Sequence, residues 1–390
     1  MSKTLFKIVK NDKRISLVGG GQELYFEVSD TAFLAEDDAY AAWALAPLAM
    51  GGLGDIVIEG MGDSVTEKNV KELTRIWSQW VPGYFEPASI TFTNHQNTNH
   101  LKERHVNAES DILLFSGGVD ATYNLLSRHR QGLKQTLLTL QGLDYPLDRD
   151  DLFEDLIKKT DAIAHLTESP RLFMATNAYR AYGNVNKKYN SIGNVGLTHG
   201  FVLAAALFLM NRGFRAGVIS ADYAQFQEYI VAPWGTNSLT NSYFKSNSFE
   251  MKVANLDVTR TQKVKYLLSC PEALTSVAFC RDKTSKPYNC GKCSKCIRTK
   301  LMFLAVAGKV PEIFSDISVS EKMLRVLDIQ RPTEKIFFVD LVTAAKEHNN
   351  ISLIPGLERT MNKALRPPSP ITRFIQKQRK SLKKRMPTIG

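Results

Sequence analysis

The sequence has no hydrophobic segment long enough to cross a membrane. Its longest apolar run, Phe201 to Met210, is about half the roughly 20 residues that a membrane-spanning helix needs. The first residues also lack the basic segment, apolar core and small-residue cleavage site of a secretory signal. We therefore expect a cytoplasmic protein. An apolar content of 44% in 390 residues is ample for a packed core, so an ordinary folded chain is expected.

Cysteine is scarce, with five residues in the chain, and this disfavours a disulfide-rich secreted scaffold. Four of the five lie in one short window, at Cys280, Cys290, Cys293 and Cys296. Four thiolates at this spacing favour a closed tetrahedral Zn²⁺ site, which has a structural role because no coordination position is left for chemistry. A redox or persulfide-carrying cysteine pair and an iron–sulfur cluster remain alternatives. Cys270 stands alone and is interpreted as a buried apolar side chain.

Acidic residues are missing from residues 366 to 390, which contain eight Lys or Arg. The chain as a whole has a formal charge of +11, so removing these eight leaves +3 for the rest. Partners that fit this basic tail are nucleic acid, an anionic membrane surface or an acidic protein, and a solvated terminus is an equal alternative. The tail also contains a single aromatic residue, Phe374, which disfavours a base-stacking RNA platform.

Residues 1 to 105 have a pattern that predicts a small α/β module. Strands are expected at 4–9, 14–18, 24–28, 55–59 and 89–93, and helices at 37–50 and 65–80. The glycines Gly51, Gly52 and Gly54 precede a strand instead of following one. They are therefore interpreted as a turn and not as a nucleotide loop.

From residue 111 onward, apolar strand-like runs alternate with helical segments. Strands are expected at 112–115, 135–140, 162–167 and 216–220, and the apolar stretch Leu197 to Met210 is expected to be a buried crossover helix. This alternation predicts an α/β fold with a parallel sheet, in which sites gather at the carboxyl ends of the strands. We divide the chain into an N-terminal module (1–105), a nucleotide-binding domain (106–258), a helical lobe with the cysteines (259–365) and the basic tail (366–390).

One of these strand ends has the composition of a phosphate-binding loop. The run Ile112 to Phe115 breaks at Ser116-Gly117-Gly118-Val119-Asp120 and continues into a helical segment. The glycines let a ligand approach the backbone, and the unpaired N–H groups of the first helical turn attract anionic oxygens. Ser116 adds a hydroxyl, and Asp120 adds a carboxylate for Mg²⁺ or for fixing the loop. A plain glycine turn is the alternative interpretation.

The full string resembles the Ser-Gly-Gly-x-Asp-Ser signature of the PP-loop ATP pyrophosphatases. No Walker-type Gly-Lys motif for phosphates is present. Ala121 stands where this family usually has serine, so one phosphate-side hydroxyl is missing. The neighbouring Thr122 is the residue that could partly replace it.

The order of motifs is similar to that of the 7-cyano-7-deazaguanine synthase branch of this superfamily. The resemblance covers about residues 111 to 305. It consists of the loop, Asp144-Tyr145, Asp222-Tyr223, the segment Thr259 to Lys263, the four cysteines and Arg298. Residues 1 to 105 have no counterpart in that branch, so the substrate of this chain is expected to differ.

The resemblance implies a HUP-type α/β fold and an enzyme that cleaves ATP to AMP and pyrophosphate. A carboxyl, carbonyl or amide oxygen of the substrate would be adenylated, and a nitrogen nucleophile would then displace AMP and form a C–N bond. ATP, Mg²⁺ and a structural Zn²⁺ are the implied bound groups. The ATP-binding residues implied are Ser116, Gly117, Gly118, Val119, Asp120, Thr122 and Asp144.

The candidate catalytic residues are Asp120, Lys263, Arg260 and Asp222. Lys263, Arg260 and Arg180 are candidate cations for the transition state or for a substrate carboxylate, and simple surface charges are the alternative. Asp222 is a candidate ligand for a metal or for a substrate amine. His199 is the histidine best placed for a site role, with a structural histidine at a helix start as an equal alternative.

A nucleic-acid-modifying thiolase or sulfur transferase is the alternative function, in which the tail and the N-terminal module would grip RNA. Modification of a deazaguanine-type base and conjugation to the terminus of a partner protein are further possibilities. Ala121 also leaves open a nucleotide sensor without turnover. The single aromatic residue in the tail favours the C–N bond-forming enzyme, which would act on a small molecule, a modified base or the terminus of a partner.

Overall fold

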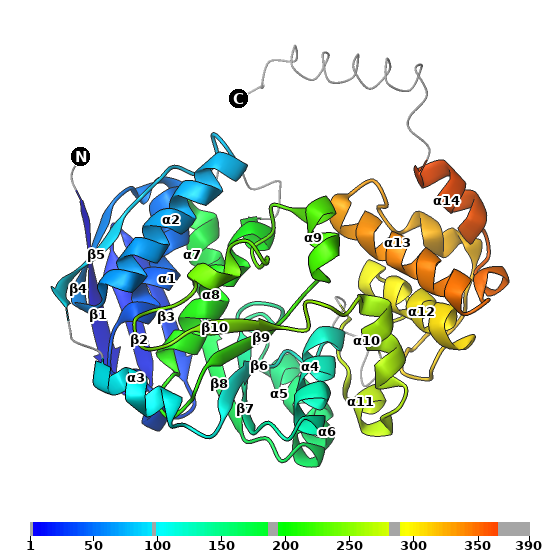
Figure 1. Ribbon diagram of the computed structural model, residues 1–390, viewed down its shortest axis with the longest axis horizontal. Coiled ribbons are helices and arrows are strands. Elements are labelled where there is room, and N and C mark those ends of the chain that lie inside the picture. The colour runs from blue at the N-terminus through cyan, green and yellow to red at the C-terminus, as the bar shows by residue number, and fades with distance from the viewer. Residues whose placement is uncertain (1–2, 96–98, 186–193, 281–288, 366–390) are drawn as a thin grey trace, which may run out of the picture.

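The computed structural model describes residues 3–95, 99–185, 194–280 and 289–365. Figure 1 shows a sheet with flanking helices in one part of the molecule and helices alone in the other. The strands are β1 (Thr4–Asn11), β2 (Arg14–Gly19), β3 (Gln22–Val28), β4 (Ile56–Gly62), β5 (Ile90–His95), β6 (Asp111–Leu114), β7 (Gln135–Gln141), β8 (Arg171–Thr176), β9 (Gly217–Ser220) and β10 (Met251–Ala254).

These strands form one sheet in the order β10-β9-β6-β7-β8-β3-β2-β1-β4-β5. The first five strands of this order are mutually parallel. β3, β2 and β1 are joined by antiparallel pairings, and β4 and β5 continue parallel to β1. The prediction of an α/β fold with a mostly parallel sheet is therefore confirmed.

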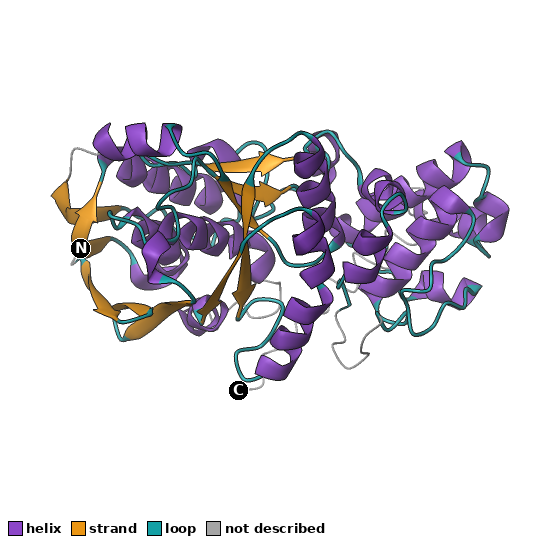
Figure 2. Ribbon diagram, turned by 90° about the horizontal axis from the view of Figure 1, so that it is seen from below, coloured by secondary structure: helices purple, strands orange, loops and turns teal. Residues whose placement is uncertain are grey.

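Helices cover both faces of the sheet and form the part of the molecule after β10 (Figure 2). They are α1 (Ala39–Leu48), α2 (Ser64–Trp80), α3 (Asn99–Val106), α4 (Val119–Arg130), α5 (Asp150–Lys159), α6 (Asp161–Leu166), α7 (Ala178–Val185), α8 (Asn194–Leu209), α9 (Gln225–Val231), α10 (Arg260–Leu267), α11 (Pro271–Ser276), α12 (Ser294–Ala307), α13 (Pro332–Glu347) and α14 (Leu357–Leu365). A π-helical turn, η2 (Ala49–Leu53), separates α1 from β4. The glycines at 51, 52 and 54 thus precede a strand, as expected.

Two hydrophobic cores lie on the two faces of the sheet. Neighbouring residues of one strand belong to different cores: in β6, Ile112 packs in the first and Leu113 in the second. This alternation follows from the two-residue period of a strand. α8 is buried against α1 in the first core, because both helices are apolar around their whole circumference. The prediction of a buried crossover helix at Leu197 to Met210 is confirmed.

The strands of the first 105 residues join the same sheet as the strands that follow. β3 pairs antiparallel with β8 through Phe26 and Thr176. The first core likewise contains residues from Phe6 to Met251, so it extends across the expected boundary at residue 105. β3 runs opposite to β8, and the turn between β2 and β3 consequently lies at the edge where the parallel strands end.

The strand expected at 162–167 is wrong, because Asp161–Leu166 is helix α6. The buried residues there are Thr160, Ile163, Ala164 and Thr167, which follow the period of a helix and not of a strand. The strand between β7 and β3 is β8, in which Leu172, Met174 and Thr176 are buried at every second position. A short apolar run cannot distinguish these two structures by composition alone.

No helix in the described part of the chain is long and apolar enough to span a membrane. The expected basic tail, residues 366–390, lies outside the described residues.

Asp37 is a buried carboxylate at the start of α1, with 3% of its surface exposed. Burial raises its pKa to about 6, and the nearby carboxylates of Asp63, Asp38 and Glu36 act in the same direction. A hydrogen bond from the N–H of Ala39 to Oδ1 opposes this rise but does not cancel it. The fold therefore favours the protonated form of Asp37.

Replacing Asp37 with asparagine is expected to stabilise the protein at about pH 8 and to have little effect near pH 4. The folded pKa of about 6 lies above the ordinary value of 3.8. The stabilisation that protonated Asp37 contributes is therefore fully present at a pH below 3.8. It is lost as the pH rises through 6, by about 3 kcal/mol. Urea unfolding of both proteins across this range measures the difference. A difference independent of pH would contradict the assignment.

Candidate functional site

The expected phosphate loop lies where the connections between the parallel strands change direction. β6 is hydrogen-bonded to β7 on one side and to β9 on the other, although β9 comes third after β6 in the chain. The chain therefore continues toward β7 after β6 and toward β10 after β9, in opposite directions along the sheet. Open α/β sheets bind their ligands at such switch points, beyond the carboxyl ends of the strands. Ser116 to Gly118 follow β6 at this position, and Asp222 follows β9.

Gly117 gives the loop its shape. Its φ of +71° is a left-handed conformation, and an added Cβ would lie 2.9 Å from Cδ1 of Leu156. The carbonyl oxygen of Gly117 accepts a hydrogen bond of 2.8 Å from the N–H of Ala278. The helical part of the chain thus holds the loop in place from the other side.

Gly118 is the N-cap of α4 and has no side chain to satisfy the first N–H groups of this helix. The exposed Ser116 lies beside it, with Oγ 3.4 Å from the N–H of Gly118. The N-terminus of α4 thus carries unsatisfied donors and the positive end of the helix dipole. This arrangement suits an anion.

Asp120, in the first turn of α4, forms ion pairs with two cations of α10. Its Oδ2 contacts Nη2 of Arg260, and its Oδ1 lies 3.1 Å from Nζ of Lys263. Nζ of Lys263 also donates a 2.6 Å hydrogen bond to the carbonyl of Ala221, and only 1% of this side chain is exposed. The structure thus brings Asp120, Lys263 and Arg260 together, with Asp120 fixing the loop to α10.

Two further contacts hold α10 in this position. Thr259 caps the helix by accepting a hydrogen bond from the N–H of Gln262, and the side-chain oxygen of Gln262 accepts one from the N–H of Thr259. The N–H and Oγ1 of Thr261 both donate to the carboxylate of Asp340 in α13, at 2.9 and 2.7 Å. The cations of α10 are therefore presented by a helix anchored at its N-terminus.

Arg298 of α12 adds a third cation beside this group. It forms a 2.7 Å ion pair with Glu334, and its guanidinium lies 4.1 Å from the ring centre of Phe337, which Arg260 approaches to 4.8 Å. Burial lowers the pKa of Arg298, and the charge of Arg260 adds to this effect. Nε of Arg260 and Nε of Arg298 are buried without a hydrogen-bond partner. Lys263, Arg260 and Arg298 thus lie among carboxylates. Asp120 and Glu334 form ion pairs with them, and the charge of Arg260 also acts on Asp222 and Asp340.

Asp222 lies after β9 in a polar setting of its own. Its Oδ2 accepts hydrogen bonds from Nε1 of Trp234 at 2.8 Å and from Oγ1 of Thr236 at 3.1 Å, and Nε2 of His199 lies 3.6 Å away. Burial disfavours the charge, but the hydrogen bond and charge of His199, the bond from Trp234 and the charge of Arg260 together lower the pKa of Asp222. Asp222 thus stays ionised. His199 sits within α8 and contacts the site, so it is not only a helix-start residue.

The remaining residues expected to bind ATP differ in accessibility. Asp144 follows β7 at the same edge and is 60% exposed, with an oxygen 3.7 Å from Nζ of Lys295. Val119 and Thr122 are buried, at 2% and 0% exposed, and Oγ1 of Thr122 has no hydrogen-bond partner. Ala121 is also buried, at 6%. The structure therefore places neither the side chain of Val119 nor that of Thr122 to contact a ligand, and the N–H of Thr122 already donates to the carbonyl of Gly118.

The four cysteines of the expected metal site converge. The Sγ atoms of Cys280, Cys290, Cys293 and Cys296 all lie within 4.8 Å of one another. The distance is 4.0 Å between Cys280 and Cys293, and 3.7 Å between Cys290 and Cys296. Zn–S bonds of about 2.3 Å place tetrahedral sulfurs about 3.8 Å apart, so the set fits Zn²⁺.

Backbone N–H groups support these sulfurs. The N–H groups of Lys292 and Cys293 point at Sγ of Cys290, at 3.4 and 3.3 Å, and the N–H of Cys296 points at Sγ of Cys293 at 3.5 Å. Such donors stabilise thiolates and orient them toward a metal. Gly291 permits the turn with a φ of +72°. The prediction that this cluster could hold a metal is therefore confirmed, and Cys270 lies outside it.

The sequence analysis did not identify several residues of the site. They are Trp234, Thr236, Glu334, Phe337 and Asp340, which lie on loops or on α13 far along the chain from the motifs they contact. None of them belongs to a recognisable local pattern, and no signal in the sequence pointed to them. No model of a known protein family, no curated protein and no solved structure matches this chain.

Proposed function

We propose that this protein is an ATP-dependent enzyme that cleaves ATP to AMP and pyrophosphate and adenylates an oxygen of its substrate. A nitrogen nucleophile then attacks the activated carbon, the C–O bond to AMP breaks, and a C–N bond forms. The observation that carries this proposal is the contact of Asp120 with Lys263 and Arg260, directly beside an uncapped helix N-terminus at the switch point of the sheet.

The cations of this site suit charge that moves onto a leaving pyrophosphate. The N–H groups at the start of α4 would bind phosphate oxygens. Lys263 and Arg260 contact Asp120 in the first turn of the same helix, so their positive charge would act on the same phosphates. Lys263 is held by the carbonyl of Ala221, so its position is set before the ligand arrives. Such preorganised charge lowers a barrier because it needs no rearrangement during the reaction.

Asp222 fits a second role at the same edge. Mg²⁺ on phosphates needs only one or two protein carboxylates, and Asp222 is ionised with Oδ1 free of the hydrogen bonds that occupy Oδ2. When bound there, Mg²⁺ would neutralise phosphate charge. His199 beside it supports the ionised form of Asp222.

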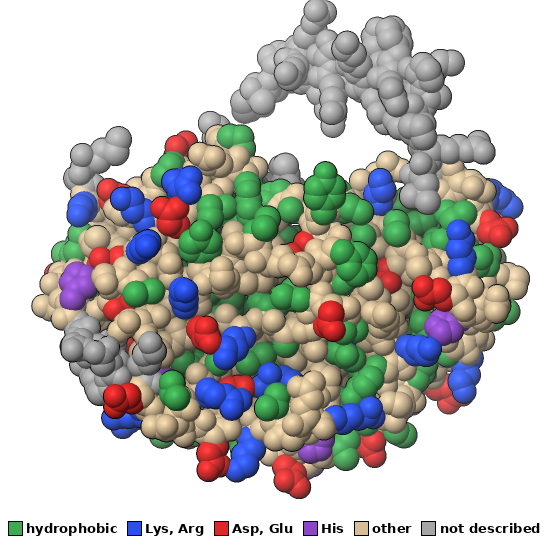
Figure 3. Space-filling model, viewed as in Figure 1, with side chains coloured by type: hydrophobic (Ala, Val, Ile, Leu, Met, Phe, Trp, Pro, Cys, Tyr) green, Lys and Arg blue, Asp and Glu red, His purple; other side chains and the backbone are tan. Residues whose placement is uncertain are grey.

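The sulfur-transferase alternative has less support. A cysteine that carries sulfur needs an accessible, reactive thiolate, whereas Cys280, Cys290 and Cys296 are buried and all four cysteines point at one another. Basic and acidic side chains are interspersed on the face shown in Figure 3, which therefore offers no continuous basic surface for RNA. A small-molecule substrate is the better fit.

The identity of the ATP products tests the proposal. The purified chain, incubated with Mg²⁺, ATP labelled at the α-phosphate and a low-molecular-weight cell extract as the substrate source, is expected to form AMP and not ADP. Gly118→Val should abolish this turnover while leaving the fold intact, because the φ of Gly118 is −74° and only Ser116 Oγ lies near an added Cβ. ADP as the product, or equal AMP formation by the variant, would refute the proposal.

A further inference from the structure

Helix α9 and the loop after it expose a group of large apolar side chains. The exposed fractions are 71% for Phe226, 93% for Tyr229, 41% for Ile230 and 69% for Leu239. The first three are spaced three and four residues apart, which places them on one face of the helix. Figure 3 shows apolar side chains gathered over the position of α9. We call these four residues the α9 patch, and an exposed apolar patch of this kind marks an interaction surface.

Contacts on the inner side of α9 hold the patch in one position. The carboxylate of Glu228 accepts hydrogen bonds from the N–H of Ser238 at 2.9 Å and from its Oγ at 2.6 Å. These bonds tie the loop that carries Leu239 to the helix. Gln227 and Val231 are buried, at 4% and 6% exposed, and α9 packs against α13. The outward side chains therefore belong to an ordered surface and not to a frayed turn.

The basic tail, residues 366–390, contains apolar residues that match this patch. They are Ile371, Phe374, Ile375 and Leu382, at positions i, i+3, i+4 and i+11. This is the spacing of one face of an amphipathic segment, and all residues between them are polar or basic. The four apolar side chains can thus leave water while the basic ones stay in it.

The tail begins close enough to the patch to reach it. The described chain ends in α14, which packs beside the turn η6 (Ile351–Leu353) just after α13. Tyr223, two residues before α9, stacks on Phe337 of α13 with ring centres 5.0 Å apart. α13 has 16 residues and is about 24 Å long. The ten residues from 366 to 375 span up to about 34 Å when extended, which exceeds the whole of α13.

Figure 1 places α9 and α14 toward the same upper edge of the molecule. The tail is therefore presented to the patch by its covalent link, at an effective concentration in the millimolar range that such short linkers give. A free partner or a second copy would have to reach this concentration in solution to compete. The chain's own tail is thus the favoured occupant.

We propose that the basic tail docks on the α9 patch of its own chain through the four apolar residues named above. The basic side chains then face solvent. Because α9 begins three residues after Asp222, the docked tail lies beside the proposed ATP site. The docking itself does not depend on the proposed reaction.

The test measures how fast a thiol placed in the patch reacts, in the full chain. Leu239→Cys and Val106→Cys are each treated with a maleimide, and peptide mass spectrometry follows modification at each position. The two natural side chains are equally exposed, at 69% and 68%, and Val106 lies at the end of α3. Docking of the tail is expected to make the thiol of the Leu239→Cys chain react at least about tenfold more slowly than that of the Val106→Cys chain.

Two pairs of tail substitutions identify the occupant. Phe374→Asp combined with Ile375→Asp should remove the protection, because charge is not buried on an apolar patch without a partner. Thr372→Asp combined with Gln376→Asp is the matched control. It adds the same charge at two polar positions of the tail and keeps the four apolar residues, so the protection should remain.

Each outcome decides for or against the docking. Protection that is lost only with Phe374→Asp and Ile375→Asp, and that does not change with protein concentration, would support it. Equal reaction at the two positions would show that the patch is uncovered. Protection that survives the loss of the apolar tail residues, or that the matched control also loses, would overturn the assignment to the tail. Protection that grows with protein concentration would assign the patch to a second copy instead.

Discussion

A Cys293→Ser variant is expected to lose its metal and to unfold at a much lower temperature than the natural protein. The natural chain should contain one Zn²⁺, because four Sγ atoms within 4.8 Å of one another form a closed tetrahedral set. Metal binding at such a site contributes directly to folding, so its loss is expected to cost more than about 4 kcal/mol. Elemental analysis and thermal unfolding of both proteins measure the two effects.

Cys270→Ser is the matched control. Cys270 is also buried, at 7% exposed, but it lies outside the cluster and its Sγ faces Glu272. Its replacement should keep the zinc and change the stability by about 1 kcal/mol. Iron in place of zinc, a natural chain without metal, or equal stability of the two variants would show that the site is not the structural zinc centre described above.

Loss of this metal should also reduce ATP turnover in the protein that remains folded. Ala278, just before Cys280, donates the hydrogen bond that holds the carbonyl of Gly117 in the expected phosphate loop. Lys295, one residue before Cys296, lies 3.7 Å from Asp144 on the loop after β7. The cysteine cluster thus positions two loops of the proposed ATP site.

Lys263→Met is expected to reduce AMP formation by about a hundredfold or more. The substitution keeps the length of the side chain and removes the charge that lies 3.1 Å from Asp120. Asp120 retains its ion pair with Arg260, so the loop should stay in place. The expected loss therefore falls on the rate of the chemical step, and turnover measured at saturating ATP is the relevant quantity.

Lys300→Met separates this effect from the loss of any buried lysine. Lys300 is fully buried, and its Nζ donates to the carbonyl of Ser318, as Lys263 donates to that of Ala221. Both variants leave a carbonyl without its donor, with a stability cost of about 1–3 kcal/mol each. Because Lys300 also lies near Cys290 and Cys296, the zinc content of both variants is measured, and only Lys263→Met should slow turnover in protein that retains its zinc. Comparable turnover by the two variants would remove Lys263 from the proposed mechanism.

Much of the local structure followed from residue patterns. The apolar stretch of α8 and the strands of the first 105 residues were predicted correctly. A strand buried on one face alternates apolar and polar residues, and a helix buried on all sides is continuously apolar. The run at 162–167 was not, since two adjacent apolar residues such as Ile163 and Ala164 suit either a strand or a helix. The cysteine spacing predicted convergence because ligands of one metal recur at short separations.

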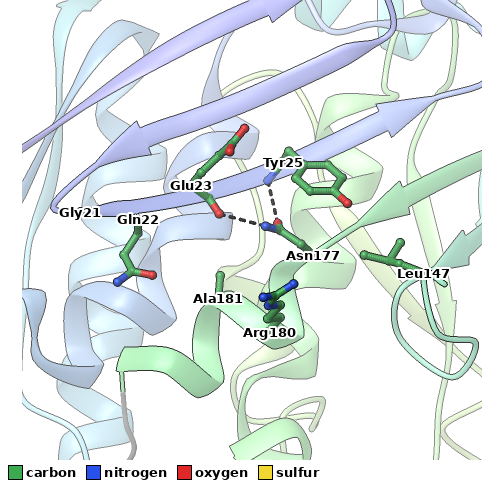
Figure 4. Close-up of a pocket in the computed structure, with 8 residues that line it drawn as sticks. All are labelled: Gly21, Gln22, Glu23, Tyr25, Leu147, Asn177, Arg180 and Ala181. Atoms are coloured by element: carbon green, nitrogen blue, oxygen red, sulfur yellow. Dashed lines mark hydrogen bonds between the residues drawn. The ribbon is translucent and has the colours of Figure 1, made fainter.

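The contacts of Asp120 with the cations of α10, and those of Arg298, could not be predicted from residue patterns alone. Asp120 and Lys263 are 143 positions apart, and nothing in either neighbourhood specifies the other. Phe337 and Glu334, which contact Arg298, lie in a helix without a motif. Asn177 likewise accepts a hydrogen bond from the N–H of Tyr25 in β3, which lies 152 positions away in the chain (Figure 4).

The sequence by itself determined the α/β class, the position of the phosphate-loop candidate and the composition of the candidate metal site, because each depends on residues close together in the chain. The tertiary structure decided the order of the strands, and with it that the loop after β6 lies beside the loop after β9. It also decided that the first strands extend the same sheet through β3 and β8 and place the β2–β3 turn beside the start of α7. These pairings depend on which apolar faces pack against one another over long separations, and a local pattern does not encode that choice.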